Sequence, residues 1–282
     1  MRFKILIDNI SRDELTAEWG LAVWIEYEGH QFLLDTGTTG SFAANAEAVG
    51  VKLGDVEIGV LSHAHFDHSD GLEEFFARNQ RASFYMRKGT KENCYSWKET
   101  DYKYIGIRQG MLERYRDRIV YVDGDHELHP GVWLIPHKTP GLEKMGQRAK
   151  QFVKIGHHMK ADDFQHEQSL VFDTEQGLVI FNSCCHGGAD TIIREVGDTF
   201  PGKKILALIG GFHLYRSAEE EVRRLAANIR ETGIRKIVTG HCTGQEAFQI
   251  LKEELGDMAE QMYAGMEMNL AILSENCYNK KH

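Results

Sequence analysis

The stretch LSHAHFDHSDG, residues 61–71, decides how the rest of the chain is interpreted. It ends an apolar run that predicts a buried strand, and it places His63, His65, Asp67 and His68 within six positions. Alternate side chains of an extended segment share a face, so the first three can converge, and His68 joins them if the chain turns there into a helix. Imidazoles with one carboxylate suit zinc, manganese or iron rather than calcium. The stretch therefore predicts a metal site at the end of a buried strand.

The composition is that of a globular protein. The chain has 282 residues, of which 42% are hydrophobic, and its net charge is −9. These values exclude disorder and argue against general nucleic-acid binding. No run approaches the roughly 20 apolar residues of a membrane span, and the first residues lack the apolar core of a signal peptide. The five cysteines favour a reducing compartment over a disulfide framework. We expect one cytoplasmic domain over residues 1–282, with no nucleic-acid or membrane partner.

Strand-like runs alternate with amphipathic helical runs along the chain. Strand hairpins recur in both halves with helices between them, which predicts two packed sheets with helices outside. The predicted strands lie at residues 2–9, 21–29, 30–37, 57–65, 118–123, 131–136, 169–183, 204–211 and 236–240. The predicted helices lie at residues 41–49, 69–79, 219–233 and 244–257.

Two regions depart from this alternation. Residues 78–118 hold eleven Lys and Arg against five acidic residues, a local charge of 11 − 5 = +6, with Tyr and Trp interleaved. We therefore expect a basic, aromatic insertion at about 84–118. Two interpretations stay open, a solvated helical insertion or a wall for an anionic substrate. Residues 141–166 are rich in Gly, Lys and His without periodicity, and predict a long irregular loop.

The His-x-His-x-Asp-His pattern at residues 63–68 resembles the signature of the metallo-β-lactamase superfamily. LLDTG at residues 33–37 is similar to that family's early strand ending in Asp. Other blocks resemble the branch of dihydropterin–ribofuranosylaminobenzene phosphate synthase-like metal-dependent hydrolases. These blocks are EQSLVF (167–172), CCHGG (184–188), IGGFHL (209–214) and GHCTG (240–244). The resemblance implies an α/β fold, a four-layer αβ/βα sandwich, with Asp35 beneath the metals, where it orients their ligands.

One ligand of the family pattern is missing from this chain. The family's His-Thr-Pro-Gly-His would place a histidine where the chain has Leu142. His186, which ends a buried run, is the candidate to replace it, and Glu167 and His166 are the alternatives. The first metal is then assigned to His63, His65 and His186. The second metal is assigned to Asp67, His68 and His241.

The resemblance implies a hydrolase with two divalent ions, zinc or else manganese or iron. They would activate water for hydrolysis, or for a related phosphoryl or pyrophosphoryl displacement. The basic insertion suggests that the substrate is an anionic, phosphorylated small molecule. Asp67 would orient this water, and His213 would stabilise charge on the attacked group unless it is only a packed histidine. Buried cysteine is usually inert, so Cys184 and Cys185 are left out of the ligand set.

Two other functions remain open at this point. Diiron-type oxidoreductases share the fold, although their pattern carries Glu where this chain keeps His65. A non-catalytic member that binds metal or ligand is the other alternative. The sequence does not identify the substrate or the oligomeric state.

Overall fold

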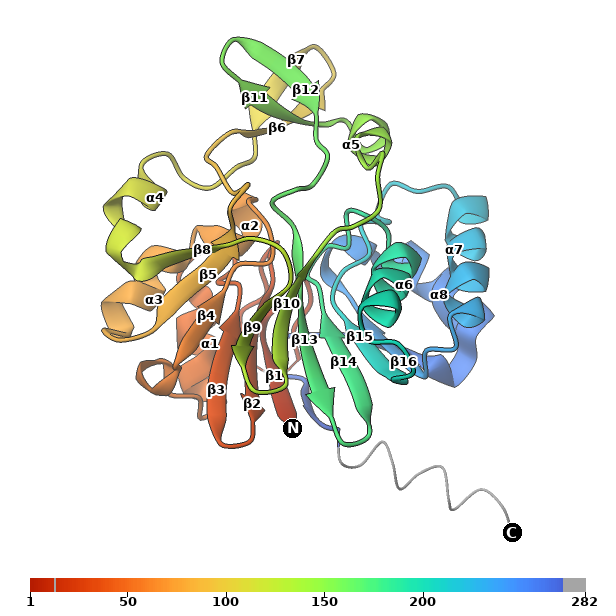
Figure 1. Cartoon of the computed structure of the whole chain (residues 1–282), viewed down its shortest axis with the longest axis horizontal. Helices are drawn as coiled ribbons and strands as arrows, with labels where there is room; N and C mark the ends of the chain where they lie inside the picture. Colours follow the sequence, from red (N-terminus) through yellow and green to blue (C-terminus); the bar gives the residue numbers. More distant parts are fainter. Residues whose placement is uncertain (13, 271–282) are drawn as a thin grey trace.

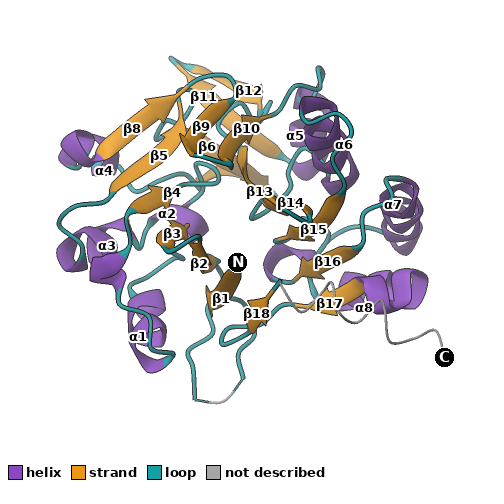
Figure 2. Cartoon of the chain, turned by 60° about the horizontal axis from the view of Figure 1, so that its bottom comes forward, coloured by secondary structure: helices purple, strands orange, loops and turns teal. Residues whose placement is uncertain are grey.

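The computed structural model describes residues 1–12 and 14–270. Within these ranges two large sheets face each other, and helices cover the outer face of each (Figures 1 and 2). Helices α1 and α3 lie outside the first sheet, and α6, α7 and α8 lie outside the second (Figure 2). The predicted four-layer αβ/βα sandwich is confirmed. No helix in the described ranges is long and apolar enough to cross a membrane.

The first sheet is built from the N-terminal half of the chain and one late strand. Its order is β18-β1-β2-β3-β4-β5-β8, with antiparallel pairing among β18, β1, β2 and β3 and parallel pairing from β3 to β8. The strands are β1 (Arg2–Ile7), β2 (Ala22–Tyr27), β3 (His30–Leu34), β4 (Ile58–Val60), β5 (Ser83–Arg87), β8 (Ile119–Val122) and β18 (Glu267–Asn269). Helices α1 (Ser41–Ala48) and α3 (Leu72–Arg78) pack on its outer face through Phe42, Phe75 and Phe76.

The second sheet comes almost entirely from the C-terminal half. Its order is β17-β16-β15-β14-β13-β10-β9, and β14 to β17 are parallel. The strands are β9 (His126–His129), β10 (Val132–Pro136), β13 (Gln168–Thr174), β14 (Gly177–Phe181), β15 (Ile205–Ile209), β16 (Lys236–Thr239) and β17 (Ala259–Gln261). The outer helices are α6 (Ala189–Thr199), α7 (Glu219–Glu231) and α8 (Gln245–Leu255). On α7 the buried residues Val222, Ala226 and Ile229 recur at helical spacing, so one apolar stripe faces the sheet.

The core between the sheets is aromatic. Phe3 of β1 meets Phe181 of β14 edge to face, with ring centroids 5.3 Å apart. Phe172 of β13 contacts both Phe181 and Phe32 in the same way. Each of these rings is fully buried, so together they remove a large apolar area from water and join the two sheets.

The parallel strands place the polar segments that follow them along one edge of the sandwich. The chain leaves β4 toward His63, β14 toward Cys184, β15 toward His213 and β16 toward His241. Because the carboxyl ends of parallel strands open on the same side, these segments meet there although they are far apart in sequence.

A smaller sheet stands above this edge (Figure 1). Its order is β12-β11-β6-β7, and β11 pairs with β6 in the register Phe152↔Tyr95. The strands are β6 (Cys94–Lys98), β7 (Asp101–Tyr104), β11 (Gln151–Ile155) and β12 (His158–Ala161). We call this sheet the cap.

The cap corrects two expectations about the irregular regions. The irregular loop predicted at 141–166 is wrong, because that segment contains α5 (Glu143–Ala149), β11 and β12. β12 pairs with β11, and β11 pairs with β6, which lies nearly sixty residues earlier in the chain, so no local pattern reveals this pairing. The insertion expected at about 84–118 starts later, since β5 belongs to the first sheet. The segment between β5 and β8 supplies half of the cap and the short helix α4 (Met111–Arg114).

Candidate metal centre

The first candidate group consists of three buried histidines from two distant segments. Ligand-type atoms of His63, His65 and His186 lie within 4.8 Å of one another. In the described structure, Nε2 of His63, Nε2 of His65 and both ring nitrogens of His186 have no hydrogen-bond partner. Burial and the neighbouring imidazoles hold the pKa of His63 and of His186 well below the usual histidine value. A divalent metal ion requires neutral, unpaired and converging imidazoles. The three histidines therefore fit such an ion.

The second candidate group lies beside the first. It combines Asp67 and His68, both on α2 (Phe66–Ser69), with His241, which follows β16. The Nε2 atoms of His68 and His241 lie 3.2 Å apart, and Asp67 Oδ2 lies 3.5 Å from His241 Nε2. Two nitrogens on one tetrahedral zinc ion, with bonds of about 2.0–2.1 Å, are about 3.3 Å apart. The structure thus brings the six residues together in the two groups of three expected from the sequence.

Asp67 is ionised in this setting. Burial alone raises the pKa of its carboxyl, but the nearby imidazoles of His68 and His241 outweigh that effect and hold the pKa well below its usual range. The indole Nε1 of Trp19 donates to Asp67 Oδ2 over 2.8 Å and fixes the carboxylate against the cluster.

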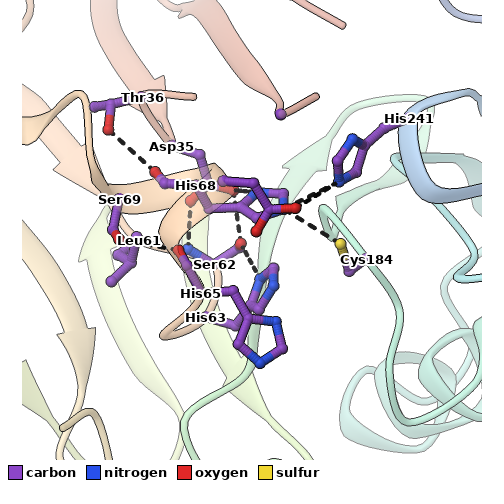
Figure 3. Close-up of polar contacts among 12 residues, drawn as sticks. Asp35, Thr36, Leu61, Ser62, His63, His65, His68, Ser69, Cys184 and His241 are labelled. Atoms are coloured by element: carbon purple, nitrogen blue, oxygen red, sulfur yellow. Dashed lines mark hydrogen bonds and ion pairs between the residues drawn. The ribbon is translucent and has the colours of Figure 1, made fainter. Parts of the chain in front are cut away.

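Asp35 directly follows β3 and contacts Ser62 and His68 (Figure 3). Its Oδ2 accepts from His68 Nδ1 at 2.7 Å and from the Ser62 hydroxyl at 2.6 Å. Because Ser62 donates to Asp35, His63 Nδ1 donates to Ser62 Oγ, 2.7 Å away. With each Nδ1 engaged, both histidines direct Nε2 into the cluster, which is how a carboxylate behind metal ligands orients them.

His241 is oriented from the end of β1, by residues that the sequence analysis missed. Its Nδ1 donates to Asn9 Oδ1 at 2.9 Å, and its backbone N–H donates to Asp8 Oδ2 at 2.9 Å. Burial raises the pKa of Asp8 to about 6. Asp8 and Asn9 lie at the end of the strand predicted at residues 2–9 and directly follow β1, and this strand-end position is the signal that could have found them. The contact of Trp19 with Asp67 carried no such signal.

Glu167, the alternative ligand, lies behind His186 and outside both groups. Its Oε1 accepts from the His186 backbone N–H at 3.0 Å, and its Oε2 accepts from Gly187 N–H at 3.2 Å and from His137 Nε2 at 2.5 Å. Glu167 therefore shapes the turn that presents His186. Leu142, at the position of the missing family ligand, is buried at the start of α5.

His166, the other alternative, is held by hydrogen bonds on both ring nitrogens. Nδ1 accepts from Ala64 N–H at 3.2 Å, and Nε2 faces Asp162 Oδ2 at 3.0 Å. With Cys94 and His65 these residues form a further group of ligand-type atoms within 4.8 Å. Because both nitrogens of His166 are engaged within the protein, this group supports the segment that carries His65.

His137 has a carboxylate on each side, and this buried arrangement gives a stability prediction. Burial lowers its pKa, but Glu167 and Glu195 outweigh that and raise it to about 9, while His137 holds the pKa of Glu195 below normal. The stabilisation is complete below the unfolded histidine pKa of about 6.5, and it is lost as pH rises through about 9. His137→Gln should lower the free energy of unfolding by about 3–5 kcal/mol near pH 6. The difference from wild type should shrink above pH 9.

Denaturant titrations of both proteins at pH 6 and pH 10 measure this. His157→Gln, at an exposed histidine beside the β11–β12 turn, is the matched control. Equal losses at the two pH values would show that packing, and not the charge on His137, stabilises the arrangement.

Two cavities open at this edge of the sandwich. One, of about 360 Å³, lies over the candidate ligands His65, Asp67 and His186. The other, of about 490 Å³, extends from His186 between α5 and α7. His213 lines both cavities and is absent from both ligand groups, and its ring centroid lies 4.6 Å from that of His186. Burial lowers the pKa of His213 to about 4, so the ring is neutral near pH 7.

Backbone strain gathers at the same edge. Asp35, Cys185, His213 and His241 have positive φ angles of 59°, 48°, 50° and 46°. Non-glycine residues adopt this conformation at a cost of about 1–3 kcal/mol each, and such residues cluster at functional sites. Asp35 and His241 carry side chains that face the cluster. Cys185 directly follows Cys184, whose sulfur faces it.

The basic insertion contributes little to these cavities. Of its lysines, Lys98 lines the cavity over the candidate ligands, while Lys88 lines a separate cavity near Asp123 and is paired with that residue at 3.5 Å. The positive charge of the insertion is therefore spread over several surfaces, and most of it faces away from the ligands.

Comparisons with known proteins show the family and the fold. Residues 18–165 match the family model of the metallo-beta-lactamase superfamily. The 7,8-dihydropterin-6-methyl-4-(beta-D-ribofuranosyl)-aminobenzene-5'-phosphate synthase of Methanocaldococcus jannaschii is 26% identical, over 88% of this chain and 89% of the relative. A metal-dependent hydrolase of the beta-lactamase superfamily superposes with a TM-score of 0.81 at 27% identity, covering 95% of this chain and 98% of its own. A diphosphatase from the PhnP family shares the fold, with a TM-score of 0.55 at 14% identity, covering 95% and 97% of the two chains.

Proposed function

Because the chain belongs to the metallo-β-lactamase superfamily, we propose that it is a hydrolase with two divalent ions, one in each group of three ligands. The first site uses His63, His65 and His186. The second uses Asp67, His68 and His241. Zinc is the expected metal, with manganese and iron as alternatives. The observation that carries the proposal is the convergence of buried imidazole nitrogens that have no partner in the described structure.

The residues around the ligands support water-dependent displacement. Divalent ions supply activated water at neutral pH and polarise the attacked group. Asp67, fixed by Trp19, orients the attacking water through its carboxylate. His213 faces the same cavity as a neutral imidazole, and it donates a hydrogen bond to oxygen as negative charge develops there. Trp19 and Tyr215 line the wall of this cavity, and their aromatic rings limit the access of bulk water.

An anionic, phosphorylated small molecule is the substrate class that the larger cavity fits. It is lined by four basic side chains, Arg148, Lys150, Arg216 and Arg224. Arg148 pairs with Glu221 at 2.8 Å, but the other three form no ion pair within the described structure. Arginine favours phosphate and carboxylate because its guanidinium donates in a fork. The name of the curated relative, a 5'-phosphate synthase, agrees with this class.

The cavity cations give a specificity prediction. Arg216→Ala or Arg224→Ala should raise KM for a phosphorylated substrate by about 10-fold or more, since a hydrogen bond to a charged group contributes about 1.5–3 kcal/mol. Neutral substrates should change little. Arg194→Ala is the control, because Arg194 lies on α6, away from this cavity. Steady-state kinetics with matched charged and neutral esters measure the effect, and equal changes in KM for both would contradict the assignment.

A substrate panel on metal-defined protein tests the reaction class. Phosphate monoesters, phosphate diesters, pyrophosphates and thioesters are offered under argon to protein loaded with zinc, manganese or iron. We expect hydrolysis of a phosphorus-containing substrate without oxygen. Oxygen consumption that depends on iron and a reductant, with no hydrolysis, would assign the chain to oxidoreductase chemistry instead.

A further inference from the structure

Cys184 is a ligand-type residue at this edge that belongs to neither group of three. It lies beyond the end of β14, in the segment that leads to His186, and its side chain is 2% exposed. Its Sγ lies 3.3 Å from His68 Nε2. Figure 3 shows the sulfur pointing into the cluster from the same side as His241.

The sulfur lies between the two groups. Cys184 falls within 4.8 Å of ligand-type atoms of His63 and His68, and separately within 4.8 Å of His241 and Cys242. His63 belongs to the first proposed site, and His68 and His241 belong to the second. The expectation that Cys184 is inert packing therefore does not describe its position, because a packing cysteine does not face imidazoles of two groups.

We propose that Cys184 supplies a sulfur ligand shared by the two metal sites, an inference that rests on the proposed function. A nitrogen and a sulfur bound to one tetrahedral zinc ion, with bonds of about 2.0–2.1 and 2.3 Å, are about 3.5 Å apart. The 3.3 Å between Cys184 Sγ and His68 Nε2 is close to this spacing. The thiolate joins the charge of Asp67 in balancing two divalent cations.

Cys242 positions this sulfur and is not itself the shared ligand. Its Sγ lies 3.3 Å from Cys184 Sγ and accepts the backbone N–H of His213 over 3.2 Å. Among the candidate groups of the described residues, Cys242 occurs with Cys184 and His241 and not with any ligand of the first site. Cys242 thereby links Cys184 to the backbone of His213 and to the wall between the cavities.

A sulfur ligand sets the metal preference of the centre. Thiolate favours zinc and iron, whereas carboxylate and water favour manganese, magnesium and calcium. With Cys184 as a ligand, zinc should displace manganese, and Cys184→Ser should reduce this preference. The histidines alone allow zinc, manganese or iron, and a sulfur ligand would make manganese the least favoured of the three.

Cys185 provides a matched control at the next position. Its Sγ contacts the Asn182 backbone oxygen at 3.5 Å, and it packs in the core beneath α6 with Ala189 and Ile192. It is equally buried, 2% exposed, but is absent from every candidate metal group in the described residues. Cys185→Ser thus tests the effect of losing a buried thiol without losing a proposed ligand.

The experiment loads the protein with Co²⁺ and records the sulfur-to-cobalt charge-transfer band in the near ultraviolet. Wild type, Cys184→Ser, Cys185→Ser and Cys242→Ser are compared at matched cobalt content, measured by elemental analysis. We expect the band in wild type, Cys185→Ser and Cys242→Ser, and its loss in Cys184→Ser. The affinity of Cys184→Ser for cobalt should fall by at least about 100-fold. Loss of a residue that only supports a ligand costs up to about 100-fold, and loss of a ligand should cost more.

The other outcomes separate this inference from the proposed function. A band that survives in Cys184→Ser, or that disappears only in Cys242→Ser, overturns the assignment of the ligand. Cobalt-loaded wild type without a band overturns the sulfur ligand and leaves the two-metal hydrolase intact, whereas wild type that binds no cobalt overturns both. If Cys184→Ser does not fold, the cadmium NMR spectrum of wild type decides, since a sulfur ligand moves the resonance strongly downfield.

Discussion

His63→Ala is expected to remove metal from the first site and to lower turnover by more than about 100-fold. The histidine is one of the three imidazoles proposed to hold that metal, and catalytic zinc sites generally use three protein ligands. Loss of a residue that merely supports a ligand already costs about 10–100-fold in affinity or activity, so loss of a ligand costs more. His65→Ala should behave in the same way. Elemental analysis and rates on the substrate found in the panel measure both effects.

The fold should survive these substitutions, because the core between the sheets contains neither histidine. Circular dichroism and thermal unfolding of the variants test this, with His157→Ala as the control at an exposed histidine. Full metal occupancy with wild-type turnover in both His63→Ala and His65→Ala would falsify the metalloenzyme proposal.

His186→Ala and Glu167→Gln should differ sharply, and this comparison tests the replacement of the missing family ligand. Both ring nitrogens of His186 are buried and unpaired in the described structure, and a ligand-type atom of His186 lies within 4.8 Å of those of His63 and His65, so its loss should release one metal and reduce turnover by more than about 100-fold. Glu167 receives hydrogen bonds from the backbone of His186 and Gly187. Glu167→Gln should therefore retain both metals and lose about 10–100-fold in activity, as expected for a partner behind a ligand.

Each variant is compared with the same preparation of wild-type protein for metal content and activity. Their stabilities need separate measurement, because Glu167 also pairs with His137 at 2.5 Å and its amide variant weakens that contact. Release of one metal by Glu167→Gln, with full retention by His186→Ala, would reverse the assignment of the third ligand.

The cluster of candidate ligands could be predicted from the sequence where its members lie close together in the chain. His63, His65, Asp67 and His68 stand within six positions, so the period of an extended strand and one helical turn are enough to converge them. His186 and His241 come from distant segments. They were assigned from the resemblance to the metallo-β-lactamase superfamily, and their positions after apolar strands supported that assignment.

What the sequence could not predict depends on contacts across the fold. In the sequence, Cys184 has the pattern of an ordinary buried cysteine. Only the structure shows that His241 and Cys242, which follow β16, lie beside it. Trp19 lies in a segment without periodicity, and only the packed structure places its indole on Asp67. Propensity and spacing carry no information about such pairs.

The cap illustrates the same limit for the fold. The two sheets of the sandwich were predictable because their strands alternate with amphipathic helices in sequence. β11 and β12 were interpreted as an irregular loop because their sequence is polar and rich in Gly, Lys and His. The structure pairs β11 with β6, and this pairing between distant segments stabilises the β11–β12 hairpin.

Anomalous X-ray diffraction at the absorption edge of the bound metal tests the central claim most directly. The account predicts two anomalous peaks per chain, one bonded to His63, His65 and His186 and the other to Asp67, His68 and His241. Metal–ligand distances should be about 2.0–2.3 Å. No peak at these residues, or a peak confined to the neighbouring group of Cys94, Asp162 and His166, would contradict it.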